Sequence, residues 1–262
     1  MIKTYIGSIV WRTLEPAHVK ALVPLLREEG FSYWPMTGDA LVERARSISA
    51  THFLRHSDAD VHLSIDSDIV GFTVEDTKRI CEQAMTSDIV AGVYVCRSAI
   101  RTFPATFYED GVRVLHGFDH TPVPVKWAAT GFMAVHRRVF ERLAQDLRLL
   151  HPNDGDRSFY PFYLPFEYEM EDGEPILLSE DYAFCERAKR AGFGCYVNPA
   201  VRLGHVGQYI YRLEDTAQPQ VDPQPIALTR QGKRWRIEGM AEKVTGEGSP
   251  KLLVPRLAIK GG

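Results

Sequence analysis

The segment that decides the fold is Val61-His62-Leu63-Ser64-Ile65-Asp66-Ser67-Asp68. Its first five residues lean apolar and predict a buried strand, which ends abruptly at two carboxylates separated by one residue. The sequence then predicts a helix over 73–85 and a second buried strand over 88–96. In α/β proteins this order places both strands in one parallel sheet, and ligands bind beyond the carboxyl ends of such strands. The acidic tripeptide is therefore expected at a ligand-binding edge.

The same alternation of strands and helices extends in both directions. Upstream, the pattern predicts strands over 4–10 and 31–34 and helices over 17–29 and 38–54. Downstream, it predicts strands over 130–135 and 195–201, helices over 137–150 and 182–191, and a long acidic surface loop over 154–181. We therefore expect an α/β fold with a Rossmann-like, mostly parallel central sheet that is flanked by helices.

The character of the chain changes near residue 213. Pro219, Pro223 and Pro225 lie among Gln and Asp, and residues 230–262 hold eight Lys or Arg against three Glu. We predict a catalytic domain over 1–212 and a small β-rich C-terminal extension over 213–262, which packs on the domain or forms a homodimer contact. Its strongest basic patch is 230–236, RQGKRWR.

Composition excludes several classes of protein. The 262 residues carry 31 Lys plus Arg against 34 Asp plus Glu, so net charge gives no sign of nucleic-acid binding. No apolar stretch approaches the roughly 18 residues of a transmembrane helix, and the N-terminus lacks a signal-peptide pattern. The four cysteines, Cys81, Cys96, Cys185 and Cys195, fit no zinc-binding spacing and are expected to be reduced. We expect a cytoplasmic protein, in the host cytoplasm if a virus or phage encodes it.

Three short segments carry the candidate chemistry, and each has a structural alternative. Asp66 and Asp68 suit a hard divalent cation, although aspartates at a strand end also turn or cap the chain. Glu180 and Asp181 stand at a predicted helix start, either as capping carboxylates or as a general base. His205, between Gly204 and Gly207, either reaches a metal or packs as a partly buried histidine.

In this order, the segments resemble those of DxD-containing, family-2-like glycosyltransferases with the GT-A fold. Asp66-Ser67-Asp68 is similar to the DxD motif, Ser179-Glu180-Asp181 to the xED segment, and Gly204-His205-Val206-Gly207 to the C-terminal histidine. Residues 129–140 resemble the loop, strand and helix at the donor-sugar pocket, and 39–46 an early helix whose arginine faces the nucleotide. The resemblance covers roughly residues 2–212. The chain departs from the pattern after its first strand (Trp11-Arg12-Thr13) and in the longer acidic loop.

The resemblance implies a role for each matching residue. It assigns Asp66 to the ribose or the metal, Asp68 and His205 to a Mn²⁺ or Mg²⁺ ion, and Asp181 to the general base, supported by Glu180. The implied nucleotide- and donor-binding residues are Arg46, Asp39, Asp66, Ser67, Thr130 and Gly131, of which Gly131 leaves room for the donor sugar. Trp127 and Tyr182 are candidate acceptor contacts, because sugar faces stack on aromatic rings.

The resulting hypothesis is a metal-dependent glycosyltransferase that uses a nucleotide-diphosphate sugar, with a UDP-sugar and an inverting mechanism favoured. The acceptor would be a hydroxyl on a glycan, a lipid-linked glycan or a modified nucleic acid. The alternatives are a retaining enzyme, a catalytically silent nucleotide- or glycan-binding module, and a sugar-nucleotide nucleotidyltransferase. The last would ordinarily carry a Gly-rich basic phosphate loop after the first strand, which Ser8 to Thr13 lack.

Overall fold

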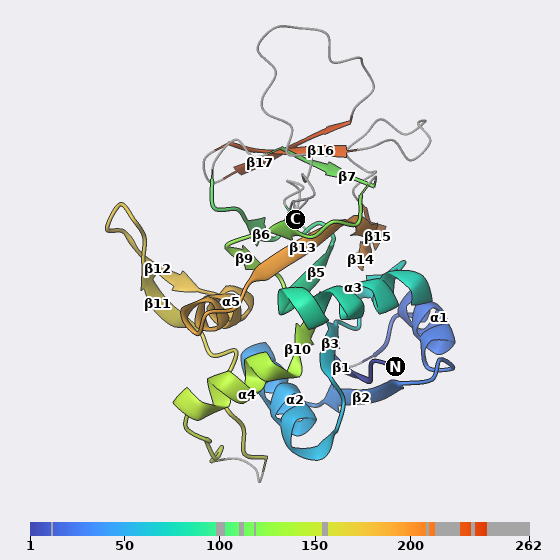
Figure 1. The fold of residues 1–262 in the computed structure, drawn as a ribbon, viewed down its shortest axis with the longest axis vertical. Helices are drawn as coiled ribbons and strands as arrows, with labels where there is room; N and C mark the ends of the chain where they lie inside the picture. The colour runs from blue at the N-terminus through green and yellow to red at the C-terminus, as the bar shows by residue number, and fades with distance from the viewer. Residues whose placement is uncertain are drawn as a thin grey trace, which may run out of the picture.

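The computed structural model describes residues 1–11, 13–97, 103–109, 113–117, 119–153, 157–207, 210–212, 226–231 and 234–239. For 113–116, 210–211, 226–231 and 234–239 it describes the backbone alone. Figure 1 shows a central sheet with helices on both of its faces. No helix of the described part is both long and apolar enough to cross a membrane.

The central sheet has seven strands in the order β2-β1-β3-β10-β5-β13-β8. Their bounds are β2 (Phe31–Thr37), β1 (Thr4–Val10), β3 (Val61–Ile65), β10 (Phe132–His136), β5 (Ile89–Val93), β13 (Cys195–Arg202) and β8 (Val123–Pro124). β1 is parallel to β2 and β3, and β5 is parallel to β13, whereas β10 runs antiparallel between β3 and β5. The predicted α/β class with a mostly parallel sheet is confirmed.

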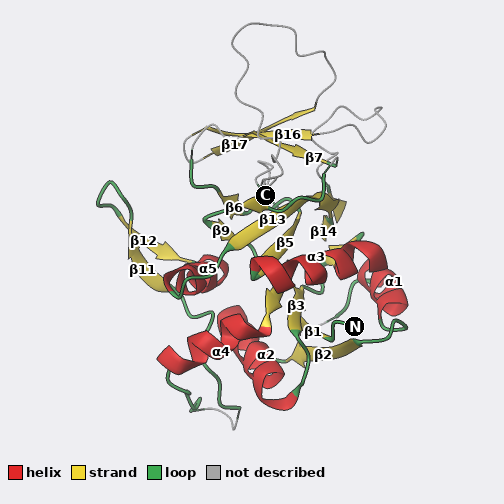
Figure 2. Cartoon of the chain, in the orientation of Figure 1, coloured by secondary structure: helices red, strands yellow, loops and turns green. Residues whose placement is uncertain are grey.

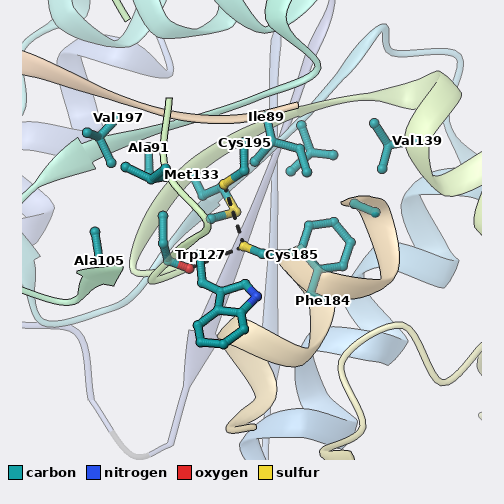
Figure 3. Close-up of a cluster of buried hydrophobic side chains, with 14 of the residues drawn as sticks. Ile89, Ala91, Ala105, Trp127, Met133, Val139, Phe184, Cys185, Cys195 and Val197 are labelled. Carbon is teal, nitrogen blue, oxygen red and sulfur yellow. Dashed lines mark hydrogen bonds between the residues drawn. The ribbon is translucent and has the colours of Figure 1, made fainter. Parts of the chain in front are cut away.

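Two apolar cores lie on opposite faces of this sheet, because successive strand residues point to opposite sides. Ile6, Val90 and Ala134 pack with Leu22 and Leu25 of α1 (Pro16–Leu25) and with Ile80 of α3 (Val74–Ser87). Their neighbours Tyr5, Ala91 and Met133 pack with the other helices. These are α2 (Val42–His56), α4 (Arg137–Asp146) and α5 (Glu180–Arg190), shown in Figure 2. Figure 3 shows part of this second core, where the thiols of Cys185 and Cys195 lie 3.7 Å apart. All four cysteines are free.

Local chemistry explains where several elements begin and end. Thr73 caps α3 because its hydroxyl accepts a hydrogen bond from the backbone N–H of Asp76 at 3.0 Å. α1 ends at Leu25, earlier than expected, and Gly30 then turns the chain at a φ of 90°. α2 begins at Val42 rather than at residue 38, because the Asp39 carboxylate accepts from the N–H of Leu41 and holds the preceding turn.

The predicted surface loop over 154–181 is wrong for most of its length. Phe159, Phe162 and Tyr163 are buried, and β11 (Phe166–Glu169) pairs with β12 (Pro175–Leu178) as a hairpin. In β11, half-buried aromatics alternate with exposed glutamates, which is the pattern of a strand with one buried face. The high acidic content therefore marks the outer face of a hairpin, and Asp172-Gly173 forms its turn. Residues 154–156 lie outside the described part.

Short strands join distant parts of the chain. β4 (Ile69–Val70) pairs with β14 (Gly204–Val206), which pairs in turn with β15 (Ile210–Tyr211). β6 (Ala105–Thr106) pairs with β9 (Trp127–Ala128). In the region predicted as an extension, β16 (Ile226–Gln231) pairs with β17 (Arg234–Gly239) and with β7 (Arg113–His116). The side chains of the predicted basic patch, and residues 213–225 and 240–262, lie outside the described part.

Candidate functional site

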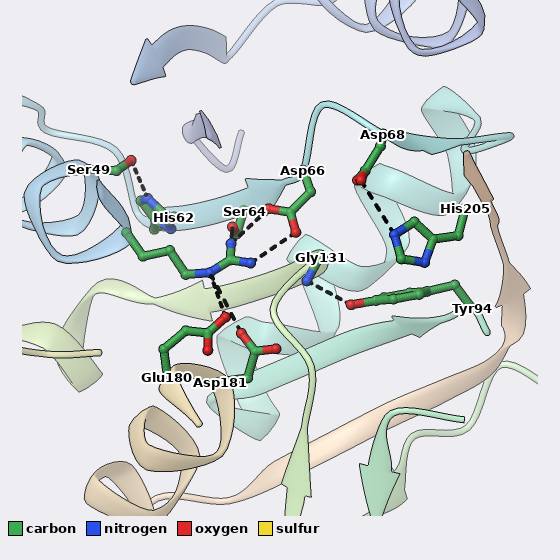
Figure 4. A network of polar contacts seen from close by, with 11 residues as sticks. Ser49, His62, Ser64, Asp66, Asp68, Tyr94, Gly131, Glu180, Asp181 and His205 are labelled. Atoms are coloured by element: carbon green, nitrogen blue, oxygen red, sulfur yellow. Dashed lines mark hydrogen bonds and ion pairs between the residues drawn. The ribbon is translucent and has the colours of Figure 1, made fainter. Parts of the chain in front are cut away.

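Strand pairing brings the acidic tripeptide and the predicted histidine together at the carboxyl end of β3. In the pairing of β14 with β4, His205 lies opposite Ile69, directly after the tripeptide. The N–H of Val206 also donates to the carbonyl of Asp68 at 2.8 Å, and the N–H of Asp66 donates to the carbonyl of Gly131 at 2.9 Å. The backbone therefore fixes the acidic turn from two sides, and Figure 4 shows the Asp68 and His205 side chains facing each other.

The contact between Asp68 and His205 has the chemistry of a cation site. Nδ1 of His205 lies 3.0 Å from the carbonyl oxygen of Val95, which can only accept, so this nitrogen carries the ring proton. Nε2 faces Oδ2 of Asp68 at 3.5 Å. A protonated ring forms an ion pair with this carboxylate, whereas a neutral ring turns a lone pair toward it. Two acceptors that face each other are stabilised by a cation or a proton between them. Arg97 also lies on this carboxylate, with Nη1 2.8 Å from Oδ2.

The pKa of Asp68 lies below its ordinary value. Burial alone would raise the pKa of this carboxyl, but the hydrogen bond and charge of His205 and the charge of Arg97 outweigh burial. Asp68 is therefore ionised at neutral pH and available as an oxygen ligand.

A carboxylate oxygen and an imidazole nitrogen fit Mn²⁺ or Mg²⁺ if substrate phosphates complete the shell. The predicted three-residue metal set, however, does not assemble: among the described residues, no group of three or more His, Cys, Asp or Glu is placed to hold a metal ion. Both oxygens of Asp66 bond to Arg46, at 2.7 and 2.9 Å. The residues that fit a cation are therefore Asp68 and His205, whereas Asp66 belongs to the neighbouring cluster.

That neighbouring cluster is built around the guanidinium of Arg46, which comes from α2 and is only 5% exposed. Besides Asp66, its Nε lies 3.6 Å from Oδ1 of Asp181 and 3.8 Å from Oε1 of Glu180. One buried cation thus faces three carboxylates from two elements, the turn after β3 and the first turn of α5. The DxD-like and xED-like segments therefore meet at Arg46.

The pKa values of Glu180 and Asp181 are both raised. Burial is the main cause for each carboxyl, and the negative charge of Asp181 adds to the effect on Glu180, while Arg46 opposes the rise in both. Oδ1 of Asp181 and Nε of Arg46 are buried without a hydrogen bond in the described part of the chain. Close carboxyls with raised pKa values are the arrangement expected of an acid–base group at a ligand site.

The other predicted donor-binding residues Asp39, Ser67 and Thr130 differ in their contacts and burial. Asp39 pairs with Arg44, whose Nε lies 2.7 Å from Oδ2. Burial raises the pKa of this carboxyl, but the hydrogen bonds from Arg44 and from the N–H of Leu41 outweigh burial and leave the pKa lowered. The carbonyl of Ser67 accepts from the N–H of Glu15 at 3.4 Å, which ties the turn to the start of α1. Thr130 is fully buried next to Asp181. These contacts describe Asp39 and Ser67 as structural partners and leave their role toward a nucleotide a prediction.

Gly131 is predicted to leave room for the donor sugar, but in the structure the absence of a side chain leaves room for Tyr94. A Cβ atom at this position would lie 2.5 Å from the hydroxyl oxygen of Tyr94, and the three nearest atoms all belong to that ring. The N–H of Gly131 donates to the same hydroxyl at 3.1 Å. The space beside Gly131 therefore accommodates Tyr94 rather than a donor sugar.

We expect Gly131→Ala to lower the free energy of unfolding by about 1–3 kcal/mol, because the added methyl group overpacks a buried site. Urea unfolding of the single variants and of Tyr94→Phe/Gly131→Ala tests the cause. If the Tyr94 side chain is the obstacle, the double variant loses less than the sum of the single variants, because the hydroxyl is gone and only the ring carbons, the nearest at 2.8 Å, still crowd the methyl group. Additive losses would show that the obstacle is elsewhere.

The predicted acceptor contacts at Trp127 and Tyr182 differ. Trp127 is 3% exposed, its indole N–H donates to Oε2 of Glu186 at 3.0 Å, and its ring stacks on Tyr182 at 5.4 Å between centroids. These contacts describe Trp127 as a residue of the core, and its role toward an acceptor stays a prediction. Tyr182 is half-buried and stays a candidate.

Three residues near the site were missed from the sequence. Tyr94 and Arg97 follow β5, the next parallel strand at the same edge of the sheet, and the rule that identified Asp66 could have identified them. His18 of α1 is fully buried, and its Nδ1 lies 2.8 Å from the carbonyl oxygen of Ile69, directly after the acidic turn. No sequence signal distinguishes His18, because its contact depends on how α1 packs.

Two cavities lie away from this site. Their volumes are about 500 and 540 Å³, and Met1, Glu29 and Phe31 line both of them where β1 and β2 begin. That is the opposite edge of the sheet from Asp66, and none of the predicted site residues lines either cavity.

Comparisons with known proteins support the fold. No family model and no curated protein matches the chain. Among solved structures, A197 from STIV is similar over 94% of this chain and 97% of its own, with a TM-score of 0.50 and 15% identity. The CMP:2-keto-3-deoxy-manno-octonic acid synthetase complexed with CTP matches 74% of this chain and 88% of its own at 12% identity, but its TM-score of 0.38 is too low to carry an argument. The first likeness shows a shared α/β fold.

Proposed function

We propose that this protein is a metal-dependent glycosyltransferase that moves a sugar from a nucleotide-diphosphate sugar, with a UDP-sugar favoured, to an acceptor hydroxyl with inversion. The observation that carries the proposal is the meeting of two sites at one edge of the sheet. Arg46 joins Asp66 to the Glu180–Asp181 pair, and two residues further along the same turn Asp68 faces His205. A carboxylate base and a cation site are the two requirements of this reaction.

The diphosphate of the donor would lie at Asp68 and His205. A divalent cation held by their oxygen and nitrogen would neutralise the charge that develops on the departing diphosphate. Arg97, half-exposed beside Asp68, brings a second positive charge to the same place. The protein supplies one carboxylate and one imidazole, and the phosphate oxygens supply further ligands.

Asp181 would be the general base. As the acceptor oxygen bonds to the anomeric carbon, the bond from that carbon to the diphosphate breaks and the hydroxyl proton passes to the Asp181 carboxylate. Burial raises the pKa of Asp181 and so makes it a stronger base than an exposed aspartate. Nε of Arg46 lies 3.6 Å from Oδ1 of Asp181, and its positive charge favours the ionised carboxylate and so limits this rise.

The cation site can be tested by binding. We expect Asp68→Asn and His205→Gln each to weaken Mn²⁺-dependent UDP binding by more than about tenfold, since each removes half of the protein's ligands. Isothermal titration with UDP, in Mn²⁺ and in EDTA, measures the effect. Asp146→Asn, an exposed carboxylate on α4, is the matched control. Unchanged Mn²⁺-dependent affinity in both site variants would contradict the assignment.

The pH profile tests the carboxyl pair. Because the base works in its ionised form and both pKa values are raised, kcat/KM should fall on the acidic side with an apparent pKa above the ordinary aspartate value of about 3.9. Glu180→Gln should move this limb to lower pH, since like charges raise each other's pKa. A limb that stays in place in Glu180→Gln would show that the pair does not set it.

Activity itself is tested with a panel of UDP-, GDP- and TDP-sugars in Mn²⁺, by following release of the nucleoside diphosphate and transfer to hydroxyl acceptors. We expect turnover with one donor class and its loss in EDTA. Tight UDP binding without turnover of any donor would instead identify a silent binding module.

A further inference from the structure

A third cavity, of about 320 Å³, lies between β6 and the tip of the β11–β12 hairpin. Figure 2 shows this hairpin projecting beside α5, the helix that begins with Glu180 and Asp181. The residues that line the cavity are Thr106, Phe107, Tyr108, Lys126, Met170, Glu171 and Asp172. None of them has a part in the proposed donor site.

The lining combines an aromatic surface with hydrogen-bonding groups. Tyr108 is 56% exposed, an unusual state for a large ring, and the carboxylates of Glu171 and Asp172 are exposed at the hairpin tip. Lys126 is held in place, because its Nζ lies 4.5 Å from the ring centre of Trp127 and 5.0 Å from that of Tyr168. A ring for the apolar face of a sugar, with carboxylates to accept from its hydroxyls, is a surface that suits a saccharide.

The charges of the cavity select among acceptors. Glu171 and Asp172 are balanced by Lys126 and by Lys189, whose Nζ lies 5.4 Å from the ring centre of Tyr108, so the cavity offers a chain of phosphates no net positive charge. A neutral glycan needs no positive charge in order to bind, and its hydroxyls can donate hydrogen bonds to both carboxylates. The charge balance therefore favours an uncharged saccharide over a nucleic acid.

Contacts connect this cavity to the catalytic carboxylates. The side chain of Thr106, in the cavity wall, lies close enough to Tyr182, the residue next to Asp181 on α5, to influence the pKa of its hydroxyl. The ring of Trp127 contacts the ammonium group of Lys126 and also stacks on the ring of Tyr182. Tyr182 thus lies between the cavity and the start of α5, where the acceptor hydroxyl would meet Asp181.

We propose that this cavity binds a neutral saccharide unit of the acceptor, next to the unit whose hydroxyl reacts, and that the acceptor is therefore a glycan. The proposal rests on the proposed function, which supplies the reacting hydroxyl at Asp181. Tyr108 is the contact that holds the saccharide, and the hairpin tip fixes its orientation through Glu171 and Asp172.

Saturation-transfer NMR with three neutral disaccharides, maltose, cellobiose and lactose, tests the proposal, together with titration by UDP and Mn²⁺ in the same samples. We expect at least one disaccharide to bind the wild-type protein and Tyr108→Ala to weaken that binding by about tenfold or more. UDP affinity should stay unchanged in this variant. Leu177→Ala, 75% exposed on the outer face of the hairpin, is the matched control and should bind like the wild type.

The outcomes separate this inference from the function on which it rests. Disaccharide binding that Tyr108→Ala leaves unchanged, or binding of a single-stranded oligonucleotide that this variant abolishes, would overturn the inference while UDP binding stands. Absence of disaccharide binding in the wild type, with UDP bound, would overturn it as well. Absence of UDP binding with every divalent metal would instead refute the proposed function.

Discussion

Arg46→Met should lower the free energy of unfolding by about 3–5 kcal/mol at neutral pH, because it leaves three carboxylates facing one another with no cation between them. In the native site, Asp66 takes two hydrogen bonds from this guanidinium, and Glu180 and Asp181 lie within 4 Å of it. Methionine retains much of the side-chain volume, so the loss reports charge rather than a cavity. Urea unfolding followed by circular dichroism measures it.

The matched control is Arg142→Met, which removes an exposed i, i+4 partner of Asp146 on α4 and should cost only about 0–1 kcal/mol. The loss in Arg46→Met should also shrink as the pH falls, because protonation of the carboxyls removes their mutual repulsion. A loss below about 1 kcal/mol at pH 7, or one that does not depend on pH, would contradict a buried charge cluster at this position.

Asp181→Asn should lower kcat by about 10²- to 10⁴-fold while UDP affinity stays near that of the wild type. Asparagine keeps the shape of the side chain and cannot accept the hydroxyl proton. Steady-state kinetics with the active donor, beside titration with UDP and Mn²⁺, separates the two effects. Glu186→Gln, a buried carboxylate one turn further along α5, is the control that should keep its kcat.

The same variant has a second expected result, in stability. A carboxyl whose folded pKa is raised binds more protons in the folded state, so stability falls as pH rises from the unfolded pKa through the folded one. Removing Asp181 removes this fall, and the variant should be as stable as the wild type or more so at pH 7. If Asp181→Asn instead loses activity because it unfolds, its free energy of unfolding at pH 7 would be lower than that of the wild type in the same samples.

The sequence predicted most of the secondary structure and the edge of the sheet where the site lies. The reason is that the turn Asp66-Ser67-Asp68 follows strand β3 directly in the sequence, and that the carboxyl ends of parallel strands lie at the same edge of a sheet. The order of the segments in the family resemblance also predicts that Glu180, Asp181 and His205 belong to one site. The structure places Glu180 and Asp181 near Arg46, which binds Asp66, and places His205 near Asp68. The proximity of His205 to Asp68 was beyond local reasoning, because it depends on the pairing of β14 with β4.

Other features depend on packing that no local pattern encodes. β10 inserts antiparallel between β3 and β5, although its sequence predicts only a strand. Trp127 adjoins the donor-like loop in sequence, yet its indole is buried against Glu186. Arg46 was expected beside the nucleotide, and the structure places its guanidinium between carboxylates from two distant segments. Each of these positions is set by which elements pack together, a property of the whole chain.

The central claim is that one edge of the sheet holds a nucleoside diphosphate through a divalent cation beside Asp181. Titration of the wild-type protein with UDP, GDP and TDP, each in Mn²⁺ and then in EDTA, tests it most directly. We expect saturable binding of one of these diphosphates, UDP first, that disappears when the metal is chelated. Equal affinity in Mn²⁺ and EDTA, or no binding of any of the three, would contradict it.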